Sequence, residues 1–438
     1  MRTWRKPAAA VALVAAASLM AACSTGGGAA TTGAASSAPA SAAAVTLTWW
    51  HNSNTDPGKS YYEQVAKDYE SSHPGVTIKI EAMAHQDMLT KLNNAWQSGT
   101  GAPDVYMERG GGELAAHVAA DLTKDITTSA ASTISTIKAY TPGFSVGDKV
   151  YALPFSMGIV GMWYNKALFA KAGITAAPTT IDELIAASDK LKKAGIQPIA
   201  LGARDAWPAA HWWYYLALRS CSQDVLVKAL ADKVFTDPCF VAAGDALKKI
   251  VGAEPFNKGF LNTPAQEGAT SASGLLANGK VAMELMGHWE PGVMQGLTDD
   301  KLGLGDDTGW FPFPAVDGGA GDPKAAIGGG DAWACSKNAP DACVEFISYL
   351  LSDKVQQGFA EKSMGLPTNP AASGSVADPV LADLLKARDA APFVQLYFDT
   401  ALGENISGAM NPAIVNIFAG KGTPQQVVDA MTKAAANE

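Results

Sequence analysis

Residues 45–62, VTLTWWHNSNTDPGKSYY, are the first segment in which a strand, a loop and a helix start can be distinguished. Residues 45–50 are rich in valine, threonine and tryptophan, which favour an extended strand. Asp56 and Pro57 are typical of a helix N-terminus, where a capping carboxylate precedes proline at the first helical position. Apolar residues then recur at helical spacing as far as about Ser71. The segment therefore predicts a strand followed directly by a helix.

The same order of elements continues along the chain. The sequence VTIKIEAM (76–83) predicts a second strand, QDMLTKLNNAWQSG (86–99) a second helix and PDVYME (103–108) a third strand. Strands that alternate with helices favour a parallel sheet covered by helices on both faces. Ligands bind such sheets at the carboxyl ends of the strands, so the polar loop that begins at His51 is a candidate part of a site.

The composition indicates a large folded core and an acidic surface. The chain has 438 residues, of which 48% are hydrophobic, and this is enough for a core divided between two lobes. The formal net charge is −9, and no segment after residue 6 is rich in lysine and arginine. Such a protein is not expected to bind nucleic acid or to dock electrostatically on an anionic membrane.

The N-terminus has the features of a targeting segment. A basic start, MRTWRK, precedes an apolar stretch that is too short to span a membrane comfortably, and LMAAC follows it. This pattern resembles a bacterial lipoprotein signal, in which residues 1–22 are removed and Cys23 is lipidated; the alternative is an ordinary secretory signal cleaved nearby. Residues 23–44 are then expected to be a disordered tether of small residues. The resemblance implies a protein anchored to the outer face of the cell membrane by Cys23.

Four further cysteines fit an exported protein, in which disulfides are allowed. Three pairings are possible, and we expect the local one, which joins Cys221 to Cys239 and Cys335 to Cys343. No Cys-x-x-Cys motif or cysteine–histidine cluster indicates zinc. We expect no metal and no cofactor.

Two segments of the second half combine a strand with an aromatic loop, namely PIALGARDAWPAAHWWYYLALRS (198–220) and GKVAMELMGHWEPG (279–292). They occur in order with LTWWHN (47–52), YALPFSMGIVGMWYNKALFAKAGI (151–174) and GGGDAWACSKNAPDACVEFISYL (328–350). The ordered set resembles the extracellular solute-binding proteins that serve carbohydrate ABC importers, over about residues 45–438. The sequence WWHN is further similar to members that take xylobiose and related oligosaccharides.

The resemblance implies an α/β, two-lobed, periplasmic-binding-protein-like fold of type II, with a hinged cleft between two α/β lobes. The chain is then expected to cross between the lobes near residues 154–158, 311–314 and 366–367, where proline residues restrict the backbone. The expected lobes are 45–155 with 315–365, and 156–314 with 366–438.

The function that this resemblance implies is capture of a small, xylobiose-like oligosaccharide in the cleft and its delivery to the permease subunits of an ABC importer. We expect a monomer that is not an enzyme and that contacts the membrane only through its lipid anchor.

A neutral sugar offers apolar faces, which aromatic rings can cover, and a rim of hydroxyl groups, which need fixed donors and acceptors. His51 and Asn52 follow the first strand and are candidates for the hydroxyl groups. Gln86 follows the second strand; Asp87, beside it, is also a candidate helix cap. Alternation along the first strand places its two tryptophans on opposite faces, so at least one is expected in the core.

Further candidates follow later strands. Trp207 and Trp289 are expected to be stacking platforms, because each lies on a short loop after a strand. Asp205 is expected to accept from a hydroxyl group or to cap the helix that begins near Trp207. The helical aromatic run at 212–215 is expected to be at least half core.

Three more polar groups complete the expected site. Glu108 either binds a hydroxyl group or pairs with its neighbour Arg109. The resemblance implies a polar contact from Asp331, in GGGDAW. Tyr397, in VQLYFDT, is a further candidate.

Sequence motifs of catalysis are weak. GFSVG (143–147) matches the Gly-x-Ser-x-Gly elbow, but a strand follows it where the elbow requires a helix. The glycine triplets lack the lysine of a phosphate-binding loop. The alternatives to an oligosaccharide receptor are a receptor for a cationic solute such as a polyamine, favoured by the acidic candidates, and a secreted carbohydrate-active enzyme.

Overall fold

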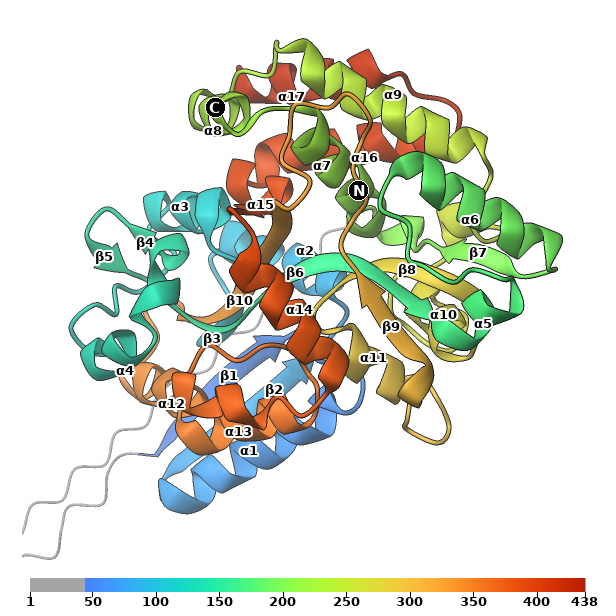
Figure 1. Ribbon diagram of the computed structural model, residues 1–438. Coiled ribbons are helices and arrows are strands. Elements are labelled where there is room, and N and C mark those ends of the chain that lie inside the picture. Colours follow the sequence, from blue (N-terminus) through green and yellow to red (C-terminus); the bar gives the residue numbers. More distant parts are fainter. Residues whose placement is uncertain (1–43, 438) are drawn as a thin grey trace, which may run out of the picture. The chain divides into compact units, whose positions relative to one another are not determined.

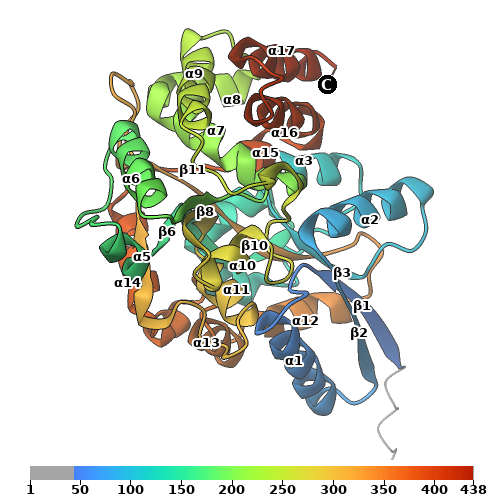
Figure 2. The same cartoon turned by 90° about the vertical axis from the view of Figure 1, so that its right-hand side faces the viewer.

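The computed structural model of the protein describes residues 44–437. Figures 1 and 2 show one large twisted sheet with helices on both faces, and the strand order is β2-β1-β3-β10-β6-β8-β7. Strand β11 pairs with β10 and strand β9 pairs with β6. The expected signal peptide, Cys23 and nearly all of the expected tether lie outside the described residues.

The elements up to the long central strand are β1 (Val45–His51), α1 (Gly58–Ser72), β2 (Val76–Ala82), α2 (His85–Ser98), β3 (Val105–Glu108), α3 (Gly111–Ala119), α4 (Ala131–Thr136), β4 (Ser145–Val146), β5 (Lys149–Val150) and β6 (Ala152–Asn165). Those that follow are α5 (Lys166–Lys171), α6 (Ile181–Lys193), β7 (Gln197–Ala200), α7 (Trp207–Ser220), α8 (Gln223–Asp232), α9 (Pro238–Gly252), α10 (Ala272–Ala277), β8 (Val281–Gly287), α11 (Glu290–Gly296) and β9 (Thr308–Phe311). The last part contains β10 (Ala326–Cys335), α12 (Ala342–Leu350), α13 (Asp353–Glu361), α14 (Pro379–Ala390), β11 (Val394–Leu396), α15 (Phe398–Leu402), α16 (Glu404–Phe418) and α17 (Pro424–Ala435).

The expected strand–helix order at the start of the chain is confirmed. Strand β1 is parallel to both β2 and β3, as alternating strands and helices predict. Helix α1 begins at Gly58, and Pro57 takes the N-cap position that the sequence assigned to Asp56. Asp56 still serves the first turn, because its carboxylate accepts from the backbone N–H of Ser60 at 3.2 Å.

The two tryptophans of β1 are both core residues. Trp49 packs with α1 and α12 on one face of the sheet, and Trp50 packs with α2 and α3 on the other. Both side chains are buried. The sheet therefore needs a large aromatic group on each face at this position, because helices cover both faces.

Strand β6 passes through both lobes of the protein. Its first half, up to Ile159, pairs with β10, and its second half, from Val160, pairs with β8 and β9. We use "first lobe" for the elements packed on β1 to β3 and "second lobe" for those packed on β7 to β9.

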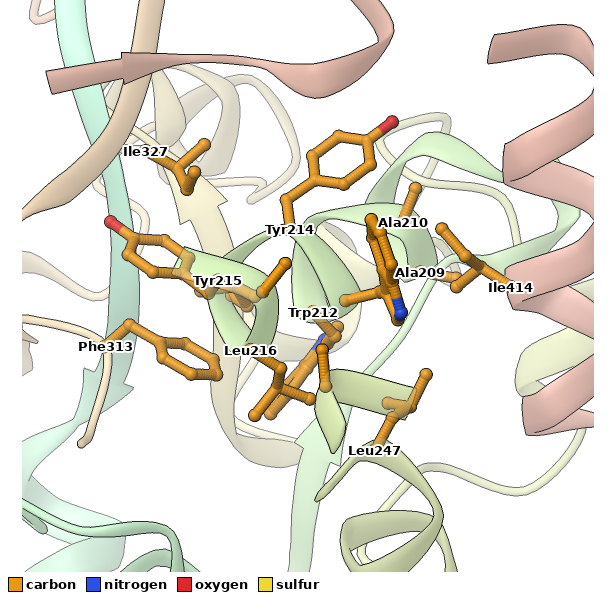
Figure 3. Packing of buried hydrophobic residues seen from close by; sticks show 14 of the residues in the cluster. Ala209, Ala210, Trp212, Tyr214, Tyr215, Leu216, Leu247, Phe313, Ile327 and Ile414 are labelled. Atoms are coloured by element: carbon orange, nitrogen blue, oxygen red, sulfur yellow. The ribbon is translucent and has the colours of Figure 1, made fainter. Parts of the chain in front are cut away.

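The core of the second lobe is highly aromatic (Figure 3). All four aromatic residues of the run 212–215 in α7 are buried, where at least half were expected to be. Figure 3 shows Tyr215 beside Phe313, and the two rings stack at 4.5 Å between centroids.

The position of Phe313 bears on where the chain crosses between lobes. Phe311 and Phe313 pack in the second-lobe core together with Ile327, whereas Trp333 packs in the core of the first lobe. We therefore propose that the second crossing lies within β10 rather than at residues 311–314.

The disulfides have the local connectivity. Cys221, after α7, is bonded to Cys239 in α9, and Cys335, at the end of β10, is bonded to Cys343 in α12. Within residues 44–437, no helix has both the length and the apolar character that a membrane crossing requires.

Two buried carboxyl groups meet between β8 and α11. The Ser273 hydroxyl donates to Glu290 at 3.0 Å and to Glu284 at 3.4 Å, and one further oxygen of each carboxyl group is buried without another partner. Burial, together with the neighbouring carboxyl, raises the pKa of Glu284 well above its usual range. Burial also raises the pKa of Glu290 to about 8. Both carboxyl groups are therefore expected to be protonated at neutral pH.

Replacing Glu284 by glutamine is expected to flatten the dependence of stability on pH. The unfolded chain loses the Glu284 proton above a pKa of 4.5, whereas burial and the neighbouring Glu290 keep it on the folded protein at neutral pH. The free energy of unfolding of the wild type should therefore fall between pH 5.5 and 7.5, by up to about 1.4 kcal/mol per pH unit more than that of Glu284→Gln. Urea unfolding at both pH values measures this, with the exposed Glu345→Gln as the control. Equal slopes for the wild type and Glu284→Gln would contradict a protonated Glu284.

Candidate functional site

A cavity of about 170 Å³ lies where loops of the two lobes meet. The first lobe contributes the loop after β1, the start of α2 and the residue after β3. The second lobe contributes the start of α7 and the turn into α11. Polar and aromatic residues of its wall are Asn52, Ser53, Asn54, Thr55, Asp56, Tyr62, His85, Arg109, Phe155, Ser156, Trp207, His211, Gln266, His288, Trp289, Asp331, Tyr397 and Asp399.

Five of the nine residues expected in the site line this cavity: Asn52, Trp207, Trp289, Asp331 and Tyr397. They come from five separate segments of the chain, and the fold brings them together. Two others, Gln86 and Asp205, line a neighbouring compartment. His51 and Glu108 line neither.

His51 lies behind the cavity wall. Its ring packs against Trp49 and Tyr62, and its Nδ1 accepts from the backbone N–H of Ser53 at 3.2 Å. Burial lowers the pKa of His51 to about 3, so the imidazole is neutral. The residue fixes the loop that carries Asn52, and the expectation of a direct ligand contact is not supported by its position.

Asn52 lies at the carboxyl end of β1 as expected. Its side-chain nitrogen lies 3.4 Å from Nδ1 of His85, at the start of α2. Burial, and then the nearby Arg109, lower the pKa of His85 to about 3. The two side chains therefore present neutral hydrogen-bonding groups to the cavity.

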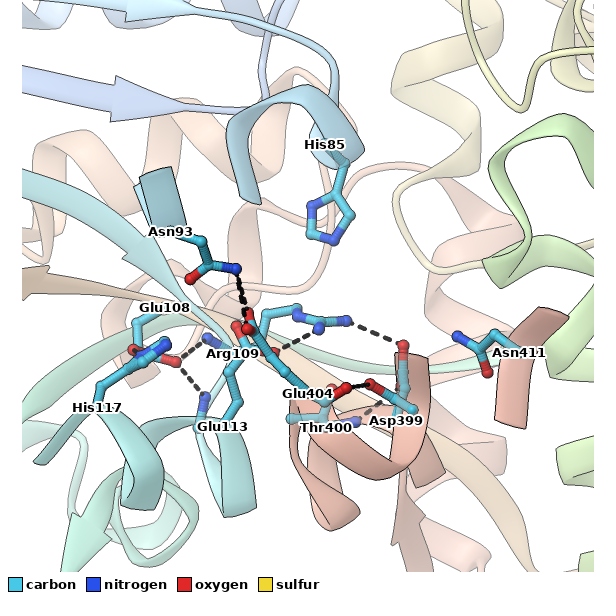
Figure 4. Close-up of polar contacts among 12 residues, drawn as sticks. His85, Asn93, Glu108, Arg109, Glu113, His117, Asp399, Thr400, Glu404 and Asn411 are labelled. Atoms are coloured by element: carbon cyan, nitrogen blue, oxygen red, sulfur yellow. Dashed lines mark hydrogen bonds and ion pairs between the residues drawn. The ribbon is translucent and has the colours of Figure 1, made fainter. Parts of the chain in front are cut away.

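Glu108 points away from the cavity, although it ends β3. Its carboxylate accepts from the backbone N–H groups of Arg109 and Gly110 and lies 2.8 Å from Nδ1 of His117. Burial lowers the pKa of His117, but the Glu108 carboxylate outweighs this effect and raises the pKa to about 9. The expected hydroxyl contact is therefore wrong for Glu108, because an internal ion pair uses this carboxylate (Figure 4).

Arg109, rather than the expected Glu108, lines the cavity at the end of β3. Its guanidinium donates to Asp399 in α15 at 3.1 Å and pairs with Glu113 in α3 (Figure 4). Burial raises the pKa of Asp399, but Arg109 outweighs this and holds the value below its usual range. The pair is therefore charged, and it joins an element of the first lobe to one of the second.

Aromatic rings form the second-lobe wall. The rings of Trp207 and Trp289 are 6.4 Å apart between centroids, with planes inclined at 63°. Trp207 begins α7 and Trp289 precedes α11, so each helix start holds one ring at the cavity. The rings of His211 and Tyr397 stack nearby, with centroids 5.3 Å apart. The pair of tryptophans at an angle offers two apolar faces to one ligand.

Several polar atoms around the cavity have no partner among residues 44–437. The Tyr397 hydroxyl, Nδ1 of His211 and Nε of Arg109 are buried and unpaired. The Asp331 carboxylate accepts no hydrogen bond from the described residues. Burial raises the pKa of Asp331 to about 6, although Arg109 opposes this shift. Unpaired groups of this kind are expected where a polar ligand completes the hydrogen bonding.

Sequence reasoning missed His211, His288, Ser156 and Asp399. The spacing of His211, four residues after Trp207 on one helix, was an available signal. Asp399 is two residues from Tyr397 in VQLYFDT. His288 forms a hydrogen bond through Nε2 with the Ser156 hydroxyl at 2.8 Å. Local sequence patterns do not predict this contact, because the two segments are distant in the chain.

The second compartment, of about 690 Å³, adjoins the first. Asp205 is occupied here, because its carboxylate accepts from Arg204 at 2.9 Å and from the backbone N–H of Ala265 at 2.8 Å. Gln86 is exposed in the first turn of α2. Neither residue reaches the cavity that contains the two tryptophans.

Comparisons with known proteins agree with this architecture. A solved structure from work on xylan utilization by Caldanaerobius polysaccharolyticus is 25% identical, with a TM-score of 0.81, over 89% of this chain and 99% of that one. A chitin oligosaccharide binding protein is 24% identical, with a TM-score of 0.79, over 90% of this chain and 98% of that one. At 24% identity, the likeness to the chitin oligosaccharide binding protein shows the fold alone.

Curated relatives are similar at the sequence level. The diacetylchitobiose binding protein DasA of Streptomyces coelicolor is 26% identical over 320 residues, which are 70% of this chain and 69% of the relative. An uncharacterized ABC transporter extracellular-binding protein of Pyrococcus horikoshii is 25% identical over 350 residues, 75% of this chain and 73% of the relative. The family described as bacterial extracellular solute-binding protein matches residues 52–357. With its two α/β lobes and the cavity between them, the chain belongs to this family of extracytoplasmic solute-binding proteins.

Proposed function

We propose that this protein binds a short neutral oligosaccharide in the cavity between its lobes and delivers it to the permease of an ABC importer. The observation that carries the proposal is the pair of inclined tryptophan rings, Trp207 and Trp289, which face a cavity rimmed with unpaired hydrogen-bonding groups. Aromatic faces match the C–H faces of sugar rings, and polar side chains match their hydroxyl groups.

The electrostatics of the cavity favour a neutral ligand. Burial lowers the pKa of His211 to about 4 and that of His288 to about 3, so both imidazoles are uncharged near neutral pH. The Arg109 charge is matched by Asp399 and Glu113. Of the two further carboxylates in the wall, Asp56 accepts from the backbone N–H of Ser60, and Asp331 accepts no hydrogen bond from the described residues, which suits a hydroxyl donor.

The names of similar proteins support the same ligand class. DasA is named for diacetylchitobiose, and the Caldanaerobius structure comes from work on xylan utilization. We infer a xylobiose-like or chitobiose-like ligand, a monomeric receptor, and an anchor at lipidated Cys23.

A receptor for a cationic solute is the second candidate, because Asp331 forms no ion pair among residues 44–437. An enzyme is disfavoured by the same wall. A glycosidase of the common type uses two carboxyl groups. Asp399 is held by Arg109 and Asp56 accepts from the first turn of α1, which leaves Asp331 as the carboxyl group without a partner among the described lining residues.

Calorimetric titration of the purified protein tests the function. We expect one-to-one binding of xylo-oligosaccharides or of chitin-derived oligosaccharides, no binding of spermidine, and no shorter sugars after prolonged incubation. Binding of spermidine alone would overturn the neutral ligand, and release of shorter sugars would show an enzyme.

The variant Trp289→Ala tests the aromatic wall. Loss of one stacking face is expected to weaken oligosaccharide binding by about 1 kcal/mol or more, a factor of at least about five. The wild-type tryptophan fluorescence should also change on binding. The matched control is Trp96→Ala, a half-buried tryptophan of α2 that lines neither compartment. Unchanged affinity in Trp289→Ala would remove this ring from the site.

The variant Gly296→Ala tests closure of the lobes. Gly296, in α11 of the second lobe, packs so closely on Asp56 of the first lobe that an added methyl group would overlap the Asp56 carbonyl oxygen. The lobes should then close less completely, and oligosaccharide affinity should fall by about tenfold or more, about 1.4 kcal/mol. In α9, Gly252→Ala has open space and is the control. Wild-type affinity in Gly296→Ala would show that this contact is not needed for binding.

A further inference from the structure

The two compartments between the lobes share a wall. His85, Arg109, Trp207 and Asp399 line both of them. Arg109 and Asp399 are directly bonded, so their ion pair lies between the smaller aromatic compartment and the larger one. Whether this ion pair stays in place therefore decides whether a ligand in the first compartment can extend into the second.

The pair is held rigidly on both sides. The exposed fractions of the Arg109 and Asp399 side chains are 13% and 7%. The same guanidinium also binds Glu113, and the second oxygen of Asp399 accepts from the backbone N–H of Thr400 at 2.9 Å. Figure 4 shows these bonds running from α3 through Arg109 to α15. Moving either group aside would leave a buried charge unpaired, which is strongly unfavourable.

The larger compartment has a wall that could bind further sugar units of a longer ligand. Its wall is polar, and Trp207 is its one aromatic residue among those described. Asn93 donates to both oxygens of Glu404 across it, at 3.0 and 2.9 Å, and this is a second bond between the lobes (Figure 4). Gln86, Asp87 and Asn411 add further hydrogen-bonding groups. The volume of about 690 Å³ would hold additional sugar units if the way into it were open.

We propose that the Arg109–Asp399 ion pair sets the length of the oligosaccharide that this protein accepts. The pair forms the end wall of the aromatic compartment, at a place where the start of α3 packs closely on the backbone of α15. Sugar units beyond those that fill the aromatic compartment gain no contacts in the closed protein. This inference rests on the proposed function and assigns the pair as its length-determining element.

A length series tests the proposal. Xylo-oligosaccharides and chitin-derived oligosaccharides of two to six units are titrated into the wild type and into Asp399→Ser. For the wild type, the affinity should change less than about twofold from three to six units. Asp399→Ser shortens the wall and leaves Arg109 paired with Glu113. In this variant the ratio of the six-unit to the two-unit affinity should rise at least about tenfold over the wild-type ratio.

The control is Asn93→Ala, which breaks the other bond between the lobes and leaves the end wall intact. Its affinity ratio should equal that of the wild type, which separates a shorter wall from looser closure. Three results would overturn the inference: a wild-type affinity that rises with every added unit, an unchanged ratio in Asp399→Ser, or an equal rise in Asn93→Ala. The wild-type series decides by itself if Asp399→Ser does not fold. If the wild type binds no oligosaccharide of either series, the proposed function itself fails.

Discussion

The continuity of strand β6 is the constraint on which the arrangement of the cleft depends. Fourteen residues run without a break from the sheet of the first lobe into that of the second. Gly158 lies against the ring of His288 and Gly161 against the ring of Trp310, and a side chain at either glycine would overlap these rings. Gly158 therefore lets the ring of His288 lie directly against the half of β6 that pairs with β10, and Gly161 makes room for Trp310 within the second lobe.

Much of the fold follows from local sequence patterns. Alternating strands and helices predicted the parallel pairing of β1 with β2 and β3, and alternation within β1 placed Trp49 and Trp50 on opposite faces. The second crossing is harder to place from the sequence. The prolines near residue 313 favour residues 311–314, whereas the packing of Phe313 on Tyr215 is the reason that we propose a crossing within β10.

For the candidate site too, some residues could be predicted from local sequence and others could not. Asn52, Trp207 and Trp289 could be expected at the cavity because each follows a strand, and position after a strand is a local property. The partners of Arg109 could not be predicted, because Asp399 is 290 residues away in the sequence and the bond between Arg109 and Asp399 exists only in the folded chain. The error at Glu108 has a related cause: the residue ends β3 as expected, but a histidine one helix later satisfies its carboxylate more completely than solvent would.

Burial explains how one cavity can hold so many titratable groups and still suit a neutral ligand. Burial lowers the pKa of each histidine in its wall and, for His85 and His211, outweighs the nearby Asp399 carboxylate, so each imidazole is held neutral. His117 shows the opposite case, because Glu108 is close enough to keep it protonated. Arg109 cannot be neutralised in this way, so its charge has to be matched by carboxylates. One of those carboxylates, Asp399, lies in α15, 290 residues further along the chain, and the charge balance of the cavity therefore depends on the close packing of α15 on the start of α3.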